Sequence, residues 1–168
     1  EQFKGKYQYD YPFDITDQDK SILKDKSNYR VYEPRLGFSS SRTAYFHNSL
    51  GGYHGAKPAL LQDVYDFYLK QQDSVVLDML NVKFIIDDQY ADGVKKRPSA
   101  LGSVWFVDEV IQVASANEAI LKLNKINPKM QALSQTIKPV VYTPMETDTI
   151  ALVEKRNNLL RYTVSTTH

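Results

Sequence analysis

The sequence predicts an α+β domain in which a central sheet, mixed or antiparallel, is covered by helices and followed by a C-terminal β-hairpin. Apolar residues recur at helical spacing in some segments and alternate in others, so both element types are expected. Strands and helices do not follow the regular rhythm of a doubly wound sheet, and no phosphate-binding glycine signature is present. With 168 residues and 42% hydrophobic content, the chain can bury the core of one domain.

Local signals place the helices. Thr16 followed by Asp19, and Ser115 followed by Glu118, match the capping box that begins many helices, with Asp in place of Glu in the first pair. Pro58 suits a first helical position. Helices are therefore expected at 17–25, near 44–49 as a short helix or turn, at 58–71, from Asp73 or Ser74 to Leu80, and from Ser115 to about Lys125.

The helix expected at 58–71 has the clearest pattern. Its apolar side chains recur every three or four residues and predict one buried face. That face consists of Leu60, Leu61, Val64, Phe67 and Tyr68.

Strands are predicted where β-branched and aromatic residues cluster between turn signals. They are expected at 29–32, 82–86, 104–113 as a strand or bent hairpin arm, 140–142, 150–154 and 159–165. The last two segments flank Arg156-Asn157-Asn158 and predict a hairpin. Residues 87–101 are expected to form a polar loop, in which Asp87-Asp88 favours a solvated turn over a catalytic pair of carboxylates.

Composition excludes several classes of function. The 21 basic and 20 acidic residues nearly balance, so no strong field attracts nucleic acid. The absence of cysteine excludes disulfides, thiolate metal sites and thiol catalysis, but it does not settle the compartment. No run approaches the eighteen or so apolar residues of a membrane span. The chain starts at Glu1 and stops in a strand-like segment, 161–168, which indicates a segment of a longer protein.

The segment 46–58 is the first candidate for a functional surface. It contains Gly51, Gly52 and Gly55, together with His47 and His54. Glycines at this density permit positive φ and close approach of other groups, and loops of this kind often carry binding residues. The pattern marks a surface without naming a reaction.

Tests for specific chemistry give weak signals. His47 and His54 could contribute to a metal site with Asp63 or Asp66, but no third ligand stands at a useful spacing. Ser49 lies near His54, yet no nucleophile-elbow motif surrounds it.

Two further segments each have a structural interpretation and a binding interpretation. Lys95-Lys96-Arg97 favours a solvated loop, with contact to a phosphate as the alternative. Trp105 and Phe106 are adjacent, so in a strand one would face the core while the other covers a helix or lines a groove.

Four segments, 29–32, 48–57, 76–86 and 97–107, form a specific pattern when they are taken in this order. Together they resemble the large extracytoplasmic region of YfhO-type bacterial membrane proteins in their Bacteroidetes form, and the resemblance covers roughly residues 15–165. Ser103 departs from the pattern, in which Asn is expected before a small residue and Trp.

The resemblance implies a parent similar to polytopic glycosyltransferases that use lipid-phosphate-linked sugars. Their catalytic carboxylate is expected on a loop between early membrane helices, outside this chain, so no catalytic residue, cofactor or metal is assigned here. Residues 1–147 would form an α+β domain on the periplasmic face of the inner membrane, and 148–168 would begin a truncated β-rich region. The implied partners are the transmembrane portion of the same polypeptide and a glycan or lipid-linked sugar, with no nucleic acid.

The leading hypothesis is an accessory domain of that membrane protein which contacts the acceptor glycan. The candidate residues for glycan or interface binding are Gly51, Gly52, Tyr53, His54, Lys57, Arg97 and Trp105. The alternative is a structural module that packs on the membrane part and has no ligand of its own. A third hypothesis is a free-standing hydrolase that uses His54 with Ser49 or Asp66.

Overall fold

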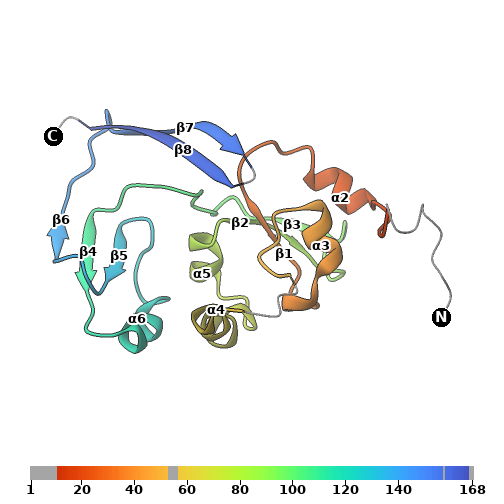
Figure 1. Ribbon diagram of the computed structural model, residues 1–168, viewed down its shortest axis with the longest axis horizontal. Helices are drawn as coiled ribbons and strands as arrows, with labels where there is room; N and C mark the ends of the chain where they lie inside the picture. Colours follow the sequence, from red (N-terminus) through yellow and green to blue (C-terminus); the bar gives the residue numbers. More distant parts are fainter. Residues whose placement is uncertain (1–10, 53–56, 157, 167–168) are drawn as a thin grey trace.

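The computed structural model describes residues 11–52, 57–156 and 158–166. It confirms the α+β class and the C-terminal hairpin (Figure 1). The helices are α2 (Asp17–Ile22), α3 (Ser41–Phe46), α4 (Ala59–Val64), α5 (Ser74–Met79) and α6 (Ala116–Lys122), with the short turns η1 (Gly37–Ser39) and η2 (Tyr65–Leu69). The strands are β1 (Arg30–Tyr32), β2 (Val82–Ile86), β3 (Val94–Lys96), β4 (Glu109–Gln112), β5 (Gln131–Ser134), β6 (Val140–Val141), β7 (Thr149–Arg156) and β8 (Leu159–Ser165).

The first sheet has the order β1-β2-β3, with β2 parallel to β1 and antiparallel to β3. It is therefore a mixed sheet, one of the two arrangements that the sequence left open. The backbone of Leu50 and Asn48 also bonds to Val31, so residues 48–50 run along the free edge of β1. This contact brings the glycine-rich segment back onto the sheet.

The central strands of the first sheet are buried on both faces. Val31 pairs with Phe84 and Tyr32 pairs with Ile85, and side chains of successive residues point to opposite faces. One core cluster is Ile22, Tyr29, Val31 and Phe84; the other is Tyr32, Leu50, Tyr68, Leu69, Val76, Leu77, Val82 and Ile85. Helix α2 thus covers one face, while α5 and η2 cover the other.

The capping signals place the short helices correctly. Thr16 and Asp19 form both bonds of a capping box at the start of α2, as predicted. The Asp73 carboxylate accepts a hydrogen bond from the Val76 N–H at the start of α5. At α6, Ser115 accepts from the Glu118 N–H, while the Glu118 carboxylate reaches the N–H of Ala114. Local side-chain-to-backbone bonds depend little on the rest of the fold, which is why they can be read from sequence.

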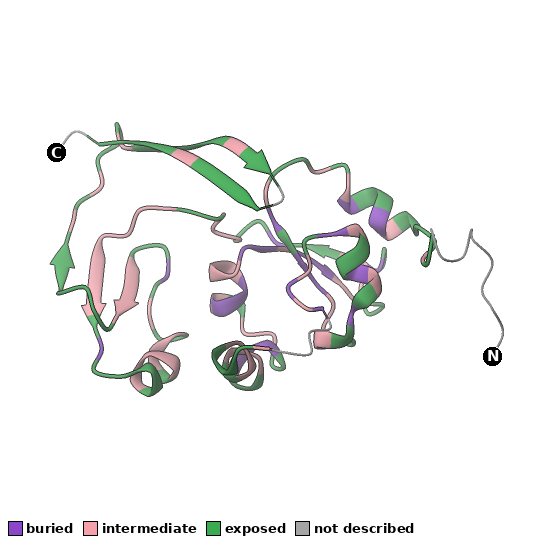
Figure 2. Cartoon of the chain, viewed as in Figure 1, coloured by how far each residue is buried: buried purple, intermediate pink, exposed green. Residues whose placement is uncertain are grey.

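The second sheet has the order β5-β4-β6, with β4 parallel to β5 and antiparallel to β6. Its residues are half-buried or exposed, in contrast to the first sheet (Figure 2). The hairpin of β7 and β8 is mostly exposed, with Val153 at 57% and Val164 at 55%. Few of the described residues therefore pack on the second sheet or on the hairpin.

Three strand predictions need correction. Residues 87–101 are not all loop, because β3 pairs with β2 through residues 94–96. Of the strand expected at 104–113, only 109–112 is paired, and β5 at 131–134 was not predicted. Each of these short strands exists through its neighbour's hydrogen bonds, a long-range condition that local pattern does not contain.

The helix expected at 58–71 is present, but its buried face differs from the prediction. It changes from α to a π-type turn at η2, which adds a residue to the turn and rotates the side chains that follow. Phe67 is consequently 48% exposed, while Leu69 is fully buried. Leu60, which precedes this turn, is also exposed, at 62%. Tyr68 is buried as predicted.

None of the helices within the described ranges combines the length and apolar character that crossing a bilayer requires. The expected boundary at residue 148 falls next to the start of β7 at Thr149. The division into 1–147 and 148–168 remains a prediction.

Candidate functional site

The glycine-rich loop is partly described. Tyr53 and His54 lie outside the described residues. Gly51 packs so tightly on the carbonyl oxygen of Gly37 that a Cβ would clash with it, and Gly37 itself has a φ of +52°. Gly52 is buried with a φ of +132°. These glycines are therefore required by close backbone contact and by left-handed geometry.

Lys57, at the end of that loop, lies over an aromatic ring. Its Nζ is 4.0 Å from the centroid of the Phe38 ring, which in turn stacks on Tyr65 with centroids 4.5 Å apart. A cation over an aromatic face is attracted by the ring quadrupole. The described part of the loop is thus packed against η1 and η2.

Arg97 is buried, with 7% of its surface exposed, and its guanidinium forms an ion pair with Asp78. The same guanidinium donates to the carbonyl oxygen of Ser74 at 3.0 Å, and Ser99 donates its hydroxyl to Asp78 at 2.7 Å. Arg97, directly after β3, therefore ties the end of that strand to helix α5. The solvated loop expected at 95–97 is wrong for this residue, since a buried cation needs a partner that local sequence does not identify.

Trp105 lies before β4, half-buried, and donates its indole N–H to the carbonyl oxygen of Pro128 at 2.8 Å. It is not in a strand, so the alternation expected for it and Phe106 does not apply. Gly51 and Gly52, Arg97, and Trp105 thus occupy three different places in the fold, each held by contacts of its own.

His47 belongs to a buried polar cluster. Its Nε2 lies 3.0 Å from Asp19, whose carboxylate is fully buried and also pairs with Arg42 and Thr16. Since a carboxylate accepts, His47 donates through Nε2, and its buried Nδ1 has no hydrogen-bond partner among the described residues. Burial alone would raise the pKa of Asp19, but hydrogen bonds from Thr16, His47 and Arg42 outweigh it and lower the pKa to about 2.

Contacts among the described residues do not support the hydrolase or metal hypotheses. Ser49 accepts a hydrogen bond from the Gly51 N–H at 3.1 Å, which closes a local turn. Asp66 pairs with Lys70 at 2.6 Å, and that hydrogen bond lowers its pKa. No cluster of three metal-ligating side chains occurs within residues 11–52, 57–156 and 158–166.

The Asp87-Asp88 pair forms the solvated turn that was favoured. Asp87 accepts from the backbone and side-chain N–H groups of Gln89, at 3.1 and 3.0 Å. Asp88 pairs with Arg35 in solvent. The two carboxylates thus bind different partners, and they do not act as a catalytic pair with each other.

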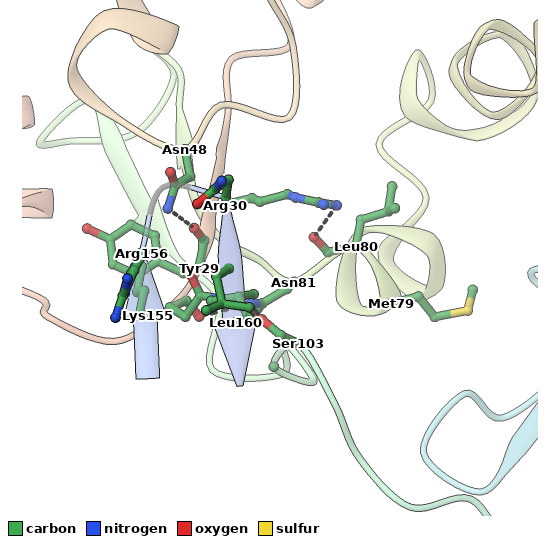
Figure 3. A pocket seen from close by; sticks show the side chains of 14 residues that line it. Tyr29, Arg30, Asn48, Met79, Leu80, Asn81, Ser103, Lys155, Arg156 and Leu160 are labelled. Carbon is green, nitrogen blue, oxygen red and sulfur yellow. Dashed lines mark hydrogen bonds between the residues drawn. The ribbon is translucent and has the colours of Figure 1, made fainter. Parts of the chain in front are cut away.

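A cavity lies at the amino ends of β1 and β2, where the turn of the β7–β8 hairpin approaches them (Figure 3). Its volume is about 860 Å³, within the range of small-molecule sites. We call it the Asn81 cleft. The described residues that line it are Asn28, Tyr29, Arg30, Asn48, Met79, Leu80, Asn81, Gly102, Ser103, Lys155, Arg156, Asn158, Leu159 and Leu160.

Asn81 is held at the junction of α5 and β2. Its φ of +58° is a left-handed conformation that Asn tolerates better than most residues, and it directly follows the end of the helix. Its N–H donates to the carbonyl oxygen of Asp78, while its own carbonyl accepts from the Arg30 N–H at 2.8 Å. The backbone therefore fixes Asn81 between helix α5 and both parallel strands.

Side-chain amides and one hydroxyl form a connected group at the cleft. Asn81 donates through Nδ2 to the carbonyl oxygen of Asn28 at 2.9 Å and to the Ser103 hydroxyl oxygen at 3.4 Å. Asn28 also donates to the Ser103 hydroxyl oxygen. Since Ser103 accepts both bonds, its own proton can point toward a ligand. Asn48 completes the group by donating to the Tyr29 carbonyl oxygen at 3.4 Å (Figure 3).

The side chains that line the Asn81 cleft offer both polar and apolar contacts. Amides and a hydroxyl can donate and accept, and Leu159 and Leu160 add apolar contact. Tyr29 serves the fold, because its hydroxyl donates to the Ile22 carbonyl oxygen. Burial, with the charge of Asp25 as a smaller cause, raises the pKa of Tyr29 and keeps the phenol protonated.

Sequence reasoning missed the residues of the Asn81 cleft as a group. Asn81 carried a signal, since Asn between a capped helix and a strand suits a left-handed helix end. Ser103 was noted only as a departure from the family pattern. Arg30 was noted only within the family segment 29–32. Asn28 and Lys155 had no signal, because nothing local indicates that the hairpin turn returns to β1.

The fold and the cleft define a class, an α+β domain with a cleft lined by several polar side chains. Comparison of the chain with protein-family models, curated proteins and solved structures found no match.

Proposed function

We propose that this chain is an extracytoplasmic accessory domain of a polytopic membrane protein of the glycosyltransferase type, and that its Asn81 cleft holds part of the acceptor glycan. The location and the parent rest on the resemblance of four sequence segments. The binding role rests on the cleft.

One observation carries the proposal. All four segments of the resemblance meet at the Asn81 cleft, although they are far apart in the sequence. Segment 29–32 supplies Tyr29 and Arg30, and segment 48–57 supplies Asn48. The other two supply Met79, Leu80, Asn81, Gly102 and Ser103. A shared surface of this kind supports a common role for segments whose individual motifs name no chemistry.

The composition of the cleft supports a sugar ligand. Saccharides present hydroxyls that both donate and accept, together with apolar C–H faces. Asn28, Asn81 and Ser103 can satisfy the hydroxyls, while Leu159 and Leu160 can pack on a C–H face. The binding residues proposed here therefore replace Gly51, Arg97 and Trp105, whose contacts serve the fold.

Titration of the whole chain with oligosaccharides tests the proposal. Maltotetraose, chitotetraose and tetragalacturonate are each added to 10 mM while the side-chain amide signals of Asn28 and Asn81 are followed by NMR. We expect at least one sugar to shift these signals. Absence of any shift with all three would contradict a glycan role.

A variant pair makes the test specific. Ser103→Ala removes the shared acceptor and should weaken sugar binding about two- to tenfold, the value of one neutral hydrogen bond. Ser103→Asn, the residue that the family pattern expects, should retain binding. Ser41→Ala, in an exposed residue at the start of α3, is the matched control. Equal loss in the Ser103→Ala and Ser41→Ala variants would place binding elsewhere.

A specific observation also favours the alternative, a module that packs on the membrane part of the same polypeptide. The hairpin exposes apolar side chains over much of its length, including Leu152, Val153, Leu160 and Val164. If this face is covered in the parent protein, trypsin should cleave at Lys155 and Arg156 more slowly in the parent, held in membranes, than in the chain alone. Equal cleavage rates would exclude packing of the hairpin.

A further inference from the structure

Positive charge gathers at the Asn81 cleft in a chain whose total charge is nearly balanced. Arg30, Lys155 and Arg156 all line it. None of its described lining residues is an Asp or a Glu. The cleft is thus a local exception to the balance of 21 basic and 20 acidic residues.

Two of these cations have no acidic partner among the described residues. Arg30 is exposed, and its guanidinium makes one long hydrogen bond, 3.4 Å to the Leu80 carbonyl oxygen (Figure 3). Lys155 is exposed and has no ion pair within the part of the chain that the structure describes. Most basic side chains on a solvated surface need no acidic partner, but Arg30 and Lys155 line one concave site together with neutral donors.

Arg156 differs from Arg30 and Lys155. Its guanidinium is 2.5 Å from Glu154, which also pairs with Arg161 at 2.9 Å. Its charge is therefore only partly offset within the hairpin, because one carboxylate serves two guanidinium groups. The cleft cations without an acidic partner among the described residues are therefore Arg30 on β1 and Lys155 on β7, two elements that meet at this cleft.

We infer that the Asn81 cleft selects an acidic saccharide, one that carries a carboxylate or a phosphate. Arg30 and Lys155 bind the acidic group, while Asn28, Asn81 and Ser103 bind neighbouring hydroxyls. The inference rests on the proposed glycan role and narrows its ligand class. Guanidinium and ammonium groups form their strongest hydrogen bonds with oxyanions, and the neutral donors alone would not distinguish acidic from neutral sugars.

The experiment compares charged and uncharged forms of the same sugar on the whole chain. Tetragalacturonate is measured against its methyl ester, and glucose 1-phosphate against glucose, by calorimetry in 20 mM salt. We expect each acidic form to bind at least fivefold more tightly than its neutral counterpart. The difference should shrink in 500 mM salt, because exposed charges are screened.

The outcomes separate this inference from the proposed function. Equal binding of acidic and neutral forms would overturn the inference and leave the glycan role standing. Failure of every sugar to bind would overturn both. Inorganic phosphate that binds as tightly as glucose 1-phosphate would also overturn the inference, since the sugar would then contribute nothing. A preference limited to the carboxylate or to the phosphate sugar would support it and identify the acidic group.

Variants locate the effect. Lys155→Gln and Arg30→Gln should each reduce the preference for the acidic form about threefold, the scale of an exposed charge interaction, with binding of the neutral form unchanged. Lys138→Gln, in an exposed lysine outside the cleft, is the control. Both cleft residues are exposed, so the variants should unfold at the wild-type temperature. An undiminished preference in the two cleft variants would contradict the assignment.

Discussion

The two three-stranded sheets share a pattern of strand pairing but not a core. Each has a central strand with one parallel and one antiparallel neighbour, β2 in the first sheet and β4 in the second. Strand β2 is buried on both faces, whereas the residues of β4 are half-buried or exposed. Strand pairing alone therefore does not make a core.

The difference lies in the helices. The first sheet has α2 on one face and α5 with η2 on the other. Helix α6 follows β4, yet its Ile120 and the next residue after the helix, Leu123, pack against the core of the first sheet. Tyr68 on η2 also donates its hydroxyl to the carbonyl oxygen of Ile120. Helix α6 thus packs on the first sheet although it follows a strand of the second. Because apolar burial supplies most of the stability and is concentrated around the first sheet, we expect most of the folding free energy to come from residues 16–101.

The sharpest test substitutes the same residue in both central strands. Ile85→Ala in β2, where the side chain is 2% exposed, should lower the free energy of unfolding by about 3 kcal/mol. Ile111→Ala in β4, where the side chain is half-buried, should lower it by about 1 kcal/mol. Urea denaturation measures both. Equal losses would show that the second sheet has a core of comparable weight.

A second test concerns the tight packing around the first sheet. Gly51→Ala places a Cβ against the carbonyl oxygen of Gly37 and should cost about 2 kcal/mol, because backbone must move. Gly102→Ala, in the connection to the second sheet, meets open space and should cost about 1 kcal/mol from its φ of +86°. Thermal unfolding compares the two variants. A larger loss at Gly102 would contradict the ranking.

Acid should lower the free energy of unfolding through Asp19, in helix α2 beside the first sheet. The folded-state pKa of about 2 lies below the unfolded value, so this stabilisation is complete above pH 5 and is lost as pH falls through 4 toward 2. We expect a loss of about 1.5 kcal/mol, less than the full pKa shift implies because Arg42 remains in contact with water.

The Asp19→Asn variant should have a shallower slope of stability against pH in that window. The slope should not vanish, because hydrogen bonds from Lys83 and Ser27 also lower the pKa of Asp25. Urea denaturation at pH 5, 4 and 3 measures the slopes. Parallel slopes for wild type and variant would exclude Asp19 as a source of acid sensitivity.

The smallest effect is expected in the hairpin. Glu154→Gln removes the ion pairs to Arg156 and Arg161, whose side chains are 71% and 65% exposed. The loss should stay below about 0.5 kcal/mol, since exposed pairs are weak. A loss above 1 kcal/mol in thermal unfolding would mean that the hairpin is coupled to the core more strongly than its exposure indicates.

Local signals predicted the elements that depend on few residues. The capping residues Thr16, Asp73 and Ser115 located three helix starts, and the alternation around 156–158 located the hairpin. Strand β3 and strand β5 escaped prediction because each is short and gains its bonds from a distant neighbour. The face of the helix at 58–71 was wrong because the π-type turn of η2 shifts the register of its side chains.

The sequence by itself determined the α+β class, the starts of α2, α5 and α6, the buried strand at 82–86 and the C-terminal hairpin. Each follows from interactions between residues close in the chain. Only the tertiary structure decided that Arg97 is buried against Asp78, that His47 contacts Asp19, and that four separate segments meet the hairpin turn at one cleft. Those arrangements depend on how distant surfaces pack, and the free energy of packing is set by the whole fold.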